Sequence, residues 1–391
     1  MDGIHTILFD ARTATRAYPG INRYIRSLLA SMIPELRPDE RLHVILPPDT
    51  VIPCLEHPSV TTYATDKPVS TFKSHWQTFK LALSIKAQIH HAPYILTPVQ
   101  VPGKMVLTVH DVIPLSHPQY STVYTRLFWK FTGRRAIWHS RKLIGVSEDA
   151  LKACARFFGP HAIRRSVVIH HGIDPAFHPQ PPEVIAEIRR TYKLPEKFLL
   201  YVGSDRPHKN VTTLLNALAL MDPTASLPLV IAGFNSENSP LRREAEQLGL
   251  EKRVQWIDEI PEEDLPALYC AAHAFLFPSL VEGFGFPVLE AMACGTPVIC
   301  SALSVLREIT GGAAKIVHPT DRQEWRRAIH AAIVSLDWHD VYREKGLARA
   351  AHFSWHAAAC ATLEVYRHLY PKPHPRSTEQ NPLCQSGTPP V

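Results

Sequence analysis

The stretch VEGFGFPVLEAMACGTPV, residues 281–298, combines a glycine turn, the start of a helix and two carboxylates. Pro287 suits the first position of a helix and Gly295 suits the position after its end, so the sequence predicts a helix from Pro287 to about Cys294. The turn before it, residues 283–285, leaves backbone amides uncovered at a helix N-terminus. Such amides, together with glycines that let a ligand approach the backbone, favour a phosphate-binding site.

A carboxylate stands on each side of this turn. Glu290 lies about one turn into the predicted helix, where it can accept both hydroxyls of a ribose. Glu282 lies across the turn, within reach of whatever extends beyond the diphosphate. A diphosphate in the middle, with a ribose on one side and a polyol on the other, describes a nucleotide-sugar. The alternative, a helix start that carries an incidental charge, accounts less well for so long and specific a string.

Two sets of short apolar runs, separated by helical patterns, indicate two parallel sheets. Continuous rather than alternating hydrophobicity is typical of strands that helices cover on both faces. The expected fold is therefore α/β, with two Rossmann-like, doubly wound domains that face a cleft and present the carboxyl ends of their strands to a ligand. The first set comprises residues 6–11, 42–47, 104–109, 142–147 and 166–172, and the second comprises residues 198–203, 227–233, 253–258, 274–279 and 296–301.

Proline residues punctuate the chain between the two sets. The stretch FHPQPPEVIAEI (177–188) predicts a linker. Helical patterns at 321–333 and 354–370 follow the second set, and the latter, with Ser354 as its N-cap, could cross back to the N-terminal domain. These boundaries predict three segments: an acceptor-side domain over residues 1–180, a nucleotide-sugar-binding domain over residues 181–370, and a disordered tail rich in Pro, Ser and Gln over residues 371–391.

The composition is that of a globular protein. Of its 391 residues, 45% are hydrophobic and 20% are charged, and the longest apolar runs are far shorter than the roughly 20 residues of a membrane span. The N-terminus begins a strand without the basic and apolar regions of a signal peptide, which predicts a cytoplasmic location. Seven cysteines, odd in number and without CxxC spacing, favour reduced thiols over disulfides or zinc.

Positive charge gathers in the N-terminal half. Residues 1–180 hold 21 Lys and Arg against 12 Asp and Glu, a net charge of +9, whereas the whole chain carries +6. This excess predicts an anionic partner such as phosphate, nucleic acid or a lipid surface. Residues 122–142 predict a helix with interleaved basic and aromatic residues, which could rest on the inner face of a membrane. Each basic residue near an anionic membrane surface would contribute about 1 kcal/mol to the free energy of binding. Alternatively, its apolar stripe packs on the sheet and its basic face is solvated.

Six stretches together resemble the GT4 family of retaining glycosyltransferases, whose GT-B fold has two Rossmann-like domains. The segment PSLVEGFGFPVLEAMACGTPVICS (278–301) is similar to the E-x7-E signature of that family. The resemblance extends over about residues 4–370 and includes a block that is similar to mannosyltransferase-like members. The further stretches, in family order, are GINRYIRSLL (20–29), HHAPYILTPV (90–99) with TVHDVIPLSHP (108–118), VSEDA (146–150), VVIHHGIDPAF (167–177) and YVGSDRPHKN (201–210).

The resemblance implies roles for further residues. Lys209 would neutralise the leaving nucleoside diphosphate. Phosphate binding would depend more heavily on Lys209 and on backbone amides, because Ser204 stands where some relatives carry arginine. The loop of Gly20, expected just before the first helix, would close over the donor phosphate. His110 would lie against the donor sugar, although Asp111 could simply hold it as a structural histidine. The candidate set is therefore His110 and Glu282 as catalytic residues, and Gly20, Ser204, Lys209, Glu282, Gly283, Phe284, Gly285 and Glu290 as donor-binding residues.

Membership of this family implies that the anomeric configuration is retained. No residue stands out as a covalent nucleophile, which favours front-face attack in which a donor phosphate oxygen takes the acceptor proton. Glu282 would then orient sugar hydroxyls. The sequence contains no Asp-x-Asp, the usual diphosphate-bound metal motif of the other glycosyltransferase architecture, so we expect neither a metal nor a cofactor.

The donor and the acceptor are less closely defined. The mannosyltransferase-like blocks favour GDP-mannose, with UDP-glucose or a related sugar as the second choice. A glycan or a polyprenyl-diphosphate-linked glycan for a surface polysaccharide is the expected acceptor, and nucleic acid is not expected. Two other enzyme classes are disfavoured. An NAD-linked oxidoreductase would need a G-x-G-x-x-G after the first strand, where this sequence has a single glycine. A glycan phosphorylase would need a pyridoxal lysine motif, which the sequence does not show. An inactive GT-B subunit that only binds a partner stays open as an alternative.

Overall fold

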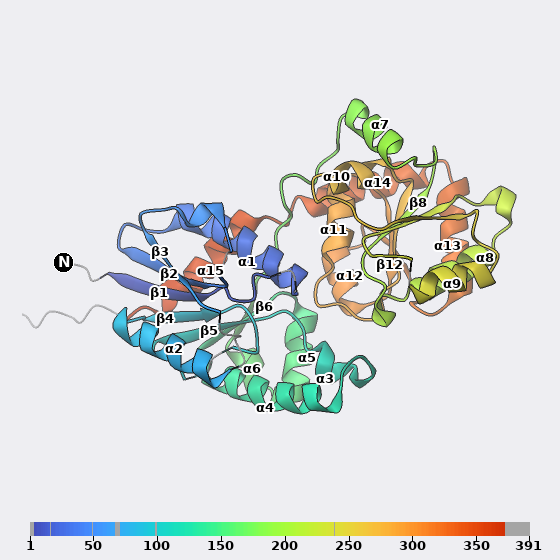
Figure 1. Ribbon diagram of the computed structural model, residues 1–391. Coiled ribbons are helices and arrows are strands. Elements are labelled where there is room, and N and C mark those ends of the chain that lie inside the picture. Colours follow the sequence, from blue (N-terminus) through green and yellow to red (C-terminus); the bar gives the residue numbers. More distant parts are fainter. Residues whose placement is uncertain are drawn as a thin grey trace, which may run out of the picture.

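The computed structural model describes residues 4–15, 17–48, 50–66, 71–97, 100–237 and 239–371, which form two lobes (Figure 1). Each lobe is built on one sheet in which all paired strands are parallel. The expected α/β fold with two doubly wound sheets is therefore confirmed. The tail predicted over residues 371–391 lies outside the described residues, apart from Pro371.

The N-terminal sheet has seven strands in the order β3-β2-β1-β4-β5-β6-β7. Its strands are β1 (His5–Asp10), β2 (Glu40–Leu46), β3 (Val60–Ala64), β4 (Ile89–Ala92), β5 (Lys104–Val109), β6 (Lys142–Gly145) and β7 (Ser166–Val168). Its helices are α1 (Pro19–Met32), α2 (Phe72–Ser84), α3 (Ile113–Ser116), α4 (Val123–His139), α5 (Glu148–Phe158) and α6 (His161–Arg164), with short turns η1 (Ile33–Glu35), η2 (Pro53–Leu55) and η3 (Pro118–Tyr120).

The C-terminal sheet has six strands in the order β10-β9-β8-β11-β12-β13. Its strands are β8 (Leu199–Val202), β9 (Leu229–Ala232), β10 (Val254–Ile257), β11 (Ala274–Phe277), β12 (Val298–Ser301) and β13 (Lys315–Val317). Its helices are α7 (Pro182–Thr191), α8 (Val211–Ala219), α9 (Pro240–Gln247), α10 (Leu265–Ala271), α11 (Phe286–Ala293), α12 (Ser304–Thr310), α13 (Arg322–Val334) and α14 (Trp338–Ala350), with turns η4 (Pro207–Lys209) and η5 (Pro223–Ala225).

Helices cover both faces of each sheet. Along β1, Ile7 and Phe9 pack toward α1 and the last helix, α15 (Trp355–Leu369), whereas Leu8 between them packs toward α2. In the second sheet, Leu200 packs among residues of α10 and α11, whereas Leu199 packs among residues of α8 and α13. Because alternate residues of a strand point to opposite faces, strands buried on both sides are apolar along their whole length.

The stretch expected to be a linker is only partly one. Residues 182–191 form α7, which packs on α10, and its Ile188 is buried in the core of the C-terminal lobe. Proline at the start of a helix costs nothing, because the first amides of a helix have no intrahelical partner. The proline pair at 181–182 therefore starts a helix, and the connection between the lobes is correspondingly shorter.

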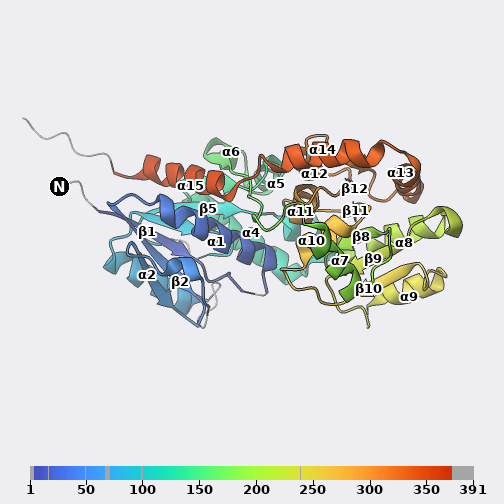
Figure 2. The same ribbon diagram turned by 90° about the horizontal axis from the view of Figure 1, so that it is seen from above.

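Helix α15 follows the C-terminal lobe in sequence but packs on the N-terminal lobe, beside α1 (Figure 2). The hydroxyl of Ser354 accepts a hydrogen bond from the amide of Ala357 at 3.4 Å, so the predicted N-cap is confirmed. At the other end, Arg367 Nε donates to Glu40 Oε1 at 3.0 Å, and this hydrogen bond holds the pKa of Glu40 below its usual range although burial opposes the shift. The chain therefore connects the two lobes twice.

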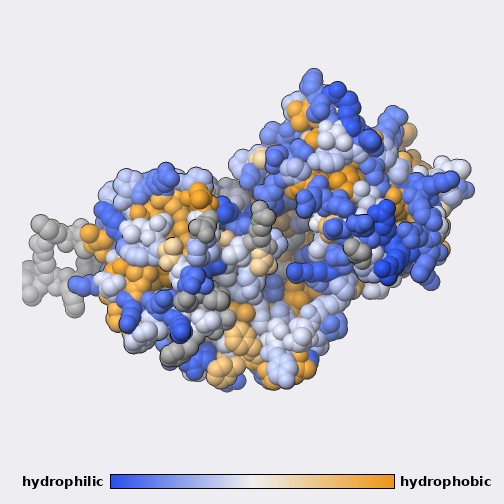
Figure 3. Space-filling view, in the orientation of Figure 1, coloured by the Kyte–Doolittle hydropathy of each residue, from blue (hydrophilic) through white to orange (hydrophobic). Residues whose placement is uncertain are grey.

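The surface of the N-terminal lobe carries apolar side chains along the edge where α4 lies (Figure 3). Among the residues that the structure describes, no helix is both long enough and apolar enough to cross a membrane.

Candidate active site

The two sheets meet through the carboxyl ends of their strands. His110 directly follows β5 in the N-terminal lobe, and the glycine turn, residues 283–285, follows β11 in the C-terminal lobe. A Cβ atom on Gly283 would lie 2.4 Å from the carbonyl oxygen of His110, so only glycine permits this approach. Ser147, which caps α5, donates its hydroxyl to the Gly283 carbonyl at 3.1 Å. Residues of the N-terminal lobe therefore hold the turn in place.

The turn leads into α11 as the sequence predicts. The helix begins at Phe286 with Gly285 before it at a φ of +115°, and it ends at Ala293. Gly295 then adopts a φ of +76°. The predicted helix is confirmed to within one residue at each end. Among the described residues, the amides of residues 283–285 donate no hydrogen bond, and they remain able to bind an anion.

Lys209 and Glu282 form an ion pair beside this turn. Lys209 Nζ lies 2.7 Å from Glu282 Oε1, and the two side chains are 19% and 12% exposed. An ammonium has three donors, so two remain for a second acceptor. Close by, burial raises the pKa of Asp111, with Glu282 adding to the shift and Lys209 opposing it. The site therefore joins the ammonium of Lys209 to the carboxyl groups of Glu282 and Asp111.

His110 presents a neutral ring to the meeting point of the lobes. Its Nε2–H donates to the carbonyl of Pro93 at 2.9 Å, and burial lowers its pKa to about 4. At neutral pH the ring is therefore uncharged, with Nδ1 as its free acceptor. The carboxylate of Asp111 accepts from the amide of Ile113 at 3.0 Å instead. The expectation that Asp111 could hold His110 is thus not met: a backbone carbonyl does so.

Glu290 lies at the junction of the lobes. Its carboxylate is buried, and Oε2 accepts from the hydroxyl of Tyr269 at 3.1 Å. Its Oε1 forms an ion pair with Arg23 of α1, in the opposite lobe. Burial raises the pKa of Glu290, and the Arg23 guanidinium opposes that shift. The carboxylate predicted to bind ribose is thus paired with a cation that the sequence analysis did not single out.

The position of Arg23 is fixed by several groups. Its guanidinium carbon lies 5.8 Å from the ring centroid of Phe286 and 6.0 Å from that of Phe177, and its Nη2 lies 3.6 Å from Glu262 Oε1. Phe286 stacks on His171 in turn, with centroids 4.9 Å apart. A basic residue one turn into the first helix, after a glycine loop, was the only signal in the sequence that could have indicated this contact.

The other predicted donor-binding residues have different surroundings. The Phe284 side chain is buried and meets His171 edge to face at 4.6 Å, so it anchors the turn in an aromatic core. Gly20 is the second residue of α1 rather than preceding it, and a Cβ there would meet nothing within 4 Å. The carbonyl of Ser204 accepts from the hydroxyl of Tyr201 at 2.8 Å. Of these three residues, Gly20 has open space at the position that a side chain would occupy.

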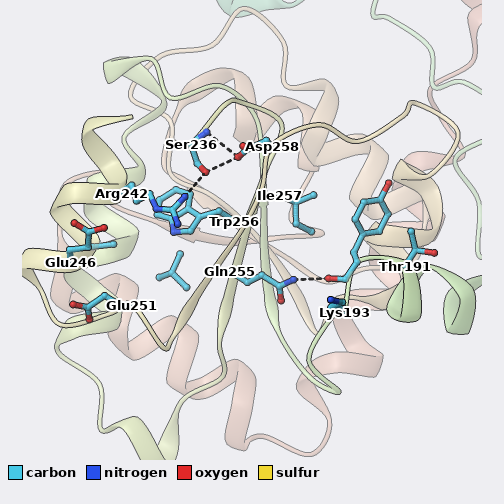
Figure 4. Close-up of a pocket in the computed structure, with 13 residues that line it drawn as sticks. Thr191, Lys193, Ser236, Arg242, Glu246, Glu251, Gln255, Trp256, Ile257 and Asp258 are labelled. Atoms are coloured by element: carbon cyan, nitrogen blue, oxygen red, sulfur yellow. Dashed lines mark hydrogen bonds between the residues drawn. The ribbon is translucent and has the colours of Figure 1, made fainter. Parts of the chain in front are cut away.

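A separate pocket lies along β10, the edge strand of the C-terminal sheet (Figure 4). It is lined by side chains from α7, α9 and β10, and Ser236 donates to Asp258 at 2.6 Å at one end. None of the predicted site residues lines it. This pocket is therefore separate from the predicted site residues.

Known proteins resemble both the sequence and the fold. Residues 184–343 match the family described as Glycosyl transferases group 1. The chain is 29% identical over 288 residues to O-antigen chain mannosyltransferase B of Escherichia coli, which covers 73% of this chain and 75% of that relative. It is also 29% identical over 283 residues to the serotype-specific mannosyltransferase WbdA of Escherichia coli, covering 69% of this chain. The matched region makes up 34% of the length of WbdA.

A solved structure shows the same arrangement of two lobes. Anabaena Alr3699/HepE in complex with UDP and glucose superposes with a TM-score of 0.74 over 93% of this chain and 100% of that one. The sequence identity is 18%, so this likeness concerns the fold alone. The expected GT-B fold is confirmed.

The ion pair between the lobes yields a first prediction. Arg23→Ala leaves Glu290 buried with Tyr269 as its remaining partner, and we expect a loss of about 1–3 kcal/mol of stability together with a more open molecule. Thermal unfolding and the radius of gyration from small-angle scattering measure the two effects. Arg26→Ala is the matched control, because Arg26 bonds to Asn22 and Val51 within its own lobe. If the two variants show the same melting temperature and the same radius of gyration, the Arg23–Glu290 pair does not hold the two lobes together.

Proposed function

We propose that this chain, which is a glycosyltransferase of the group 1 family, transfers a mannosyl unit from GDP-mannose to a glycan or a polyprenyl-diphosphate-linked glycan. The product would be a surface polysaccharide. The mannosyltransferases of O-antigen synthesis among its relatives support the sugar and the setting. The observation that carries the proposal is the Lys209–Glu282 pair beside unpartnered amides, at the place where the two lobes meet.

The diphosphate of the donor fits the start of α11. The amides of residues 283–285 and the helix dipole offer fixed positive charge, and Lys209 has two donors to spare. This arrangement stabilises the charge that develops on the leaving nucleoside diphosphate, which is the main demand of the reaction. We propose that no metal ion is needed for this step, since amides and one ammonium supply the charge.

The sugar would lie between Glu282 and His110. Glu282 is placed to orient sugar hydroxyls, and the neutral ring of His110 offers Nδ1 as an acceptor from the other lobe. We propose retention of configuration by front-face attack, in which a donor phosphate oxygen takes the proton of the acceptor hydroxyl. The close approach of the lobes at Gly283 would exclude water, which otherwise competes as an acceptor.

Glu290 would bind the ribose of the donor by exchanging partners. In this structure Arg23 takes Glu290 Oε1, and Tyr269 takes Oε2. The hydroxyls of a ribose can replace the guanidinium on the carboxylate, which frees Arg23 to turn toward the diphosphate. A cation that is released beside a newly bound anion keeps the local charge balanced. Donor binding and the contact between the lobes would therefore be coupled.

Two alternatives differ in donor or in class. The Anabaena neighbour was solved with UDP and glucose, which keeps a UDP-glucose-type donor as the second choice. An inactive subunit that only binds a partner would not need Lys209, Glu282 and the unpartnered amides in one place. A thermal-shift screen of nucleotide-sugars separates the donors: stabilisation by UDP-sugars alone would overturn the preference for GDP-mannose.

The two carboxylates should affect different steps. Glu290→Ala should weaken GDP binding about tenfold or more, because the ribose contact is lost, whereas Glu282→Ala should leave GDP binding nearly unchanged and chiefly impair transfer. Isothermal titration of GDP into each variant, together with transfer rates, makes the comparison. Glu183→Ala, at an exposed position on α7, serves as the control. Equal and unchanged GDP affinity in both variants would remove the assignment of these roles.

The N-terminal lobe, where we expect the acceptor to bind, has an apolar surface on α4. The inner face of this helix packs into the N-terminal lobe through Trp129, Ala136 and Ile137. A second apolar set stays exposed, at 41–86% of each side chain, and exposed basic residues flank it. The exposed apolar residues are Tyr124, Leu127, Phe128, Phe131 and Trp138, and the exposed basic ones are Lys130, Arg134 and Arg141.

We propose that this surface rests on an anionic membrane that holds the lipid-linked acceptor. Exposed aromatic and aliphatic side chains insert at a lipid interface, and the neighbouring cations are attracted to anionic headgroups. The inner face of α4 already has its packing partners, and the second apolar set lies outside the buried core, although Trp138 meets the ring of His161 edge to face at 5.6 Å. The sequence alone left a buried stripe and a membrane contact as alternatives, whereas the structure shows one buried and one exposed apolar face.

Co-sedimentation with liposomes tests this surface. The protein should bind anionic vesicles at low salt, bind neutral vesicles weakly, and lose binding as salt rises. Leu127→Ser with Phe131→Ser should reduce binding several-fold, whereas Leu336→Ser, at a residue 93% exposed near α14, should not. Binding that ignores lipid charge, or that the double variant retains in full, would favour an acceptor outside the membrane.

A further inference from the structure

Three metal-ligating side chains meet where α15 packs beside η1. His356 and Cys360 are four residues apart on α15 and therefore share one face of the helix. Glu35, the last residue of η1, is 321 positions away from His356 in the chain. His356 Nε2 lies 3.1 Å from Glu35 Oε1 and 3.7 Å from Cys360 Sγ. The three ligand atoms all lie within 4.8 Å of one another.

These distances suit a tetrahedral metal ion. Zinc binds imidazole nitrogen and carboxylate oxygen at about 2.0–2.2 Å and thiolate sulfur at about 2.3 Å, which separates tetrahedral ligand atoms by roughly 3.3–3.7 Å. The His356–Glu35 and His356–Cys360 distances are already close to these values. The side chains of His356 and Glu35 are 67% and 41% exposed, so an ion can enter from solvent with only small side-chain rotations.

The donor set identifies the class of ion. Magnesium and calcium select oxygen ligands, whereas a thiolate, an imidazole and a carboxylate together suit zinc. We propose that Glu35, His356 and Cys360 bind a zinc ion, with water in the fourth position. The site would be structural, because it joins two packed elements and shares no residue with the predicted donor-binding set. It is independent of the proposed transfer reaction.

Binding there would reinforce the return of α15 to the N-terminal lobe. Arg367, farther along the same helix, donates to the carbonyl of Glu35 at 2.9 Å and to Glu40, so the end of η1 and the start of β2 already contact α15. An ion that binds the folded arrangement but not the unfolded chain stabilises it in proportion to ln(1 + [Zn]/Kd). The ligands belong to segments far apart in sequence, which is why a search for CxxC or closely spaced histidines does not find them.

Cobalt(II) titration of the full chain, without an affinity tag, tests the site directly. A thiolate bound to cobalt produces a charge-transfer band in the near ultraviolet, and tetrahedral coordination produces visible d–d bands. We expect both for the wild-type chain, displacement by an equivalent of zinc, and a zinc-dependent rise in melting temperature. Cys360→Ser should lose the charge-transfer band, and His356→Ala should lose most of the affinity.

The matched controls come from the same lobe. Cys54→Ser removes another half-buried thiol, and His368→Ala removes another exposed histidine of α15, so both should bind cobalt as the wild type does. Circular dichroism verifies that each variant is folded. The absence of a charge-transfer band in the wild-type chain, or a band and a zinc-dependent melting shift that persist in Cys360→Ser, overturns the proposal. Neither outcome bears on the transfer of mannose.

Discussion

The approach of Gly283 to the carbonyl of His110 is the constraint on which the rest of the site depends. A side chain at residue 283 would collide with that carbonyl, so glycine lets the two sheets bring their carboxyl ends together. On either side of Gly283 in the sequence, Glu282 pairs with Lys209 and Phe284 packs into the aromatic core around His171. The residues that the sequence predicts to bind the donor therefore have two roles. Glu282 and Lys209 offer charged groups beside the turn, whereas Phe284 anchors the turn in the core.

Two ion pairs of different character lie at this junction. Lys209 and Glu282 belong to one lobe and are partly exposed, so a diphosphate can share the ammonium at little cost. Arg23 and Glu290 belong to opposite lobes, and the carboxylate is buried. Removing one partner of a buried pair leaves a charge without solvation, which is costly unless another group replaces it. A ribose that replaces Arg23 on Glu290 would meet this condition, and it would make the contact between the lobes sensitive to the donor.

Much of the fold and part of the site could be predicted from the sequence, because strong local signals coincide with the global structure. The strands with unbroken apolar runs were found, but three were missed: β3 is half exposed, β4 carries His90 and His91, and β13 has three residues. Proline and glycine marked both ends of α11. Local patterns could not indicate contacts between distant segments, such as Arg23 with Glu290 at a separation of 267 residues, or Glu35 with His356. Helix α4 was ambiguous because it is apolar on two faces.

The central claim is that the Lys209–Glu282 pair and the amides of the glycine turn activate a nucleotide-sugar without a metal. Release of GDP from GDP-mannose, measured in excess EDTA with wild-type chain and with Glu282→Ala, tests it most directly. The account predicts release that persists in the chelator and falls by about a hundredfold or more in the variant, the range typical for loss of one electrostatic contact in a transition state. No release from any nucleoside-diphosphate sugar, or activity that EDTA abolishes and manganese restores, would contradict it.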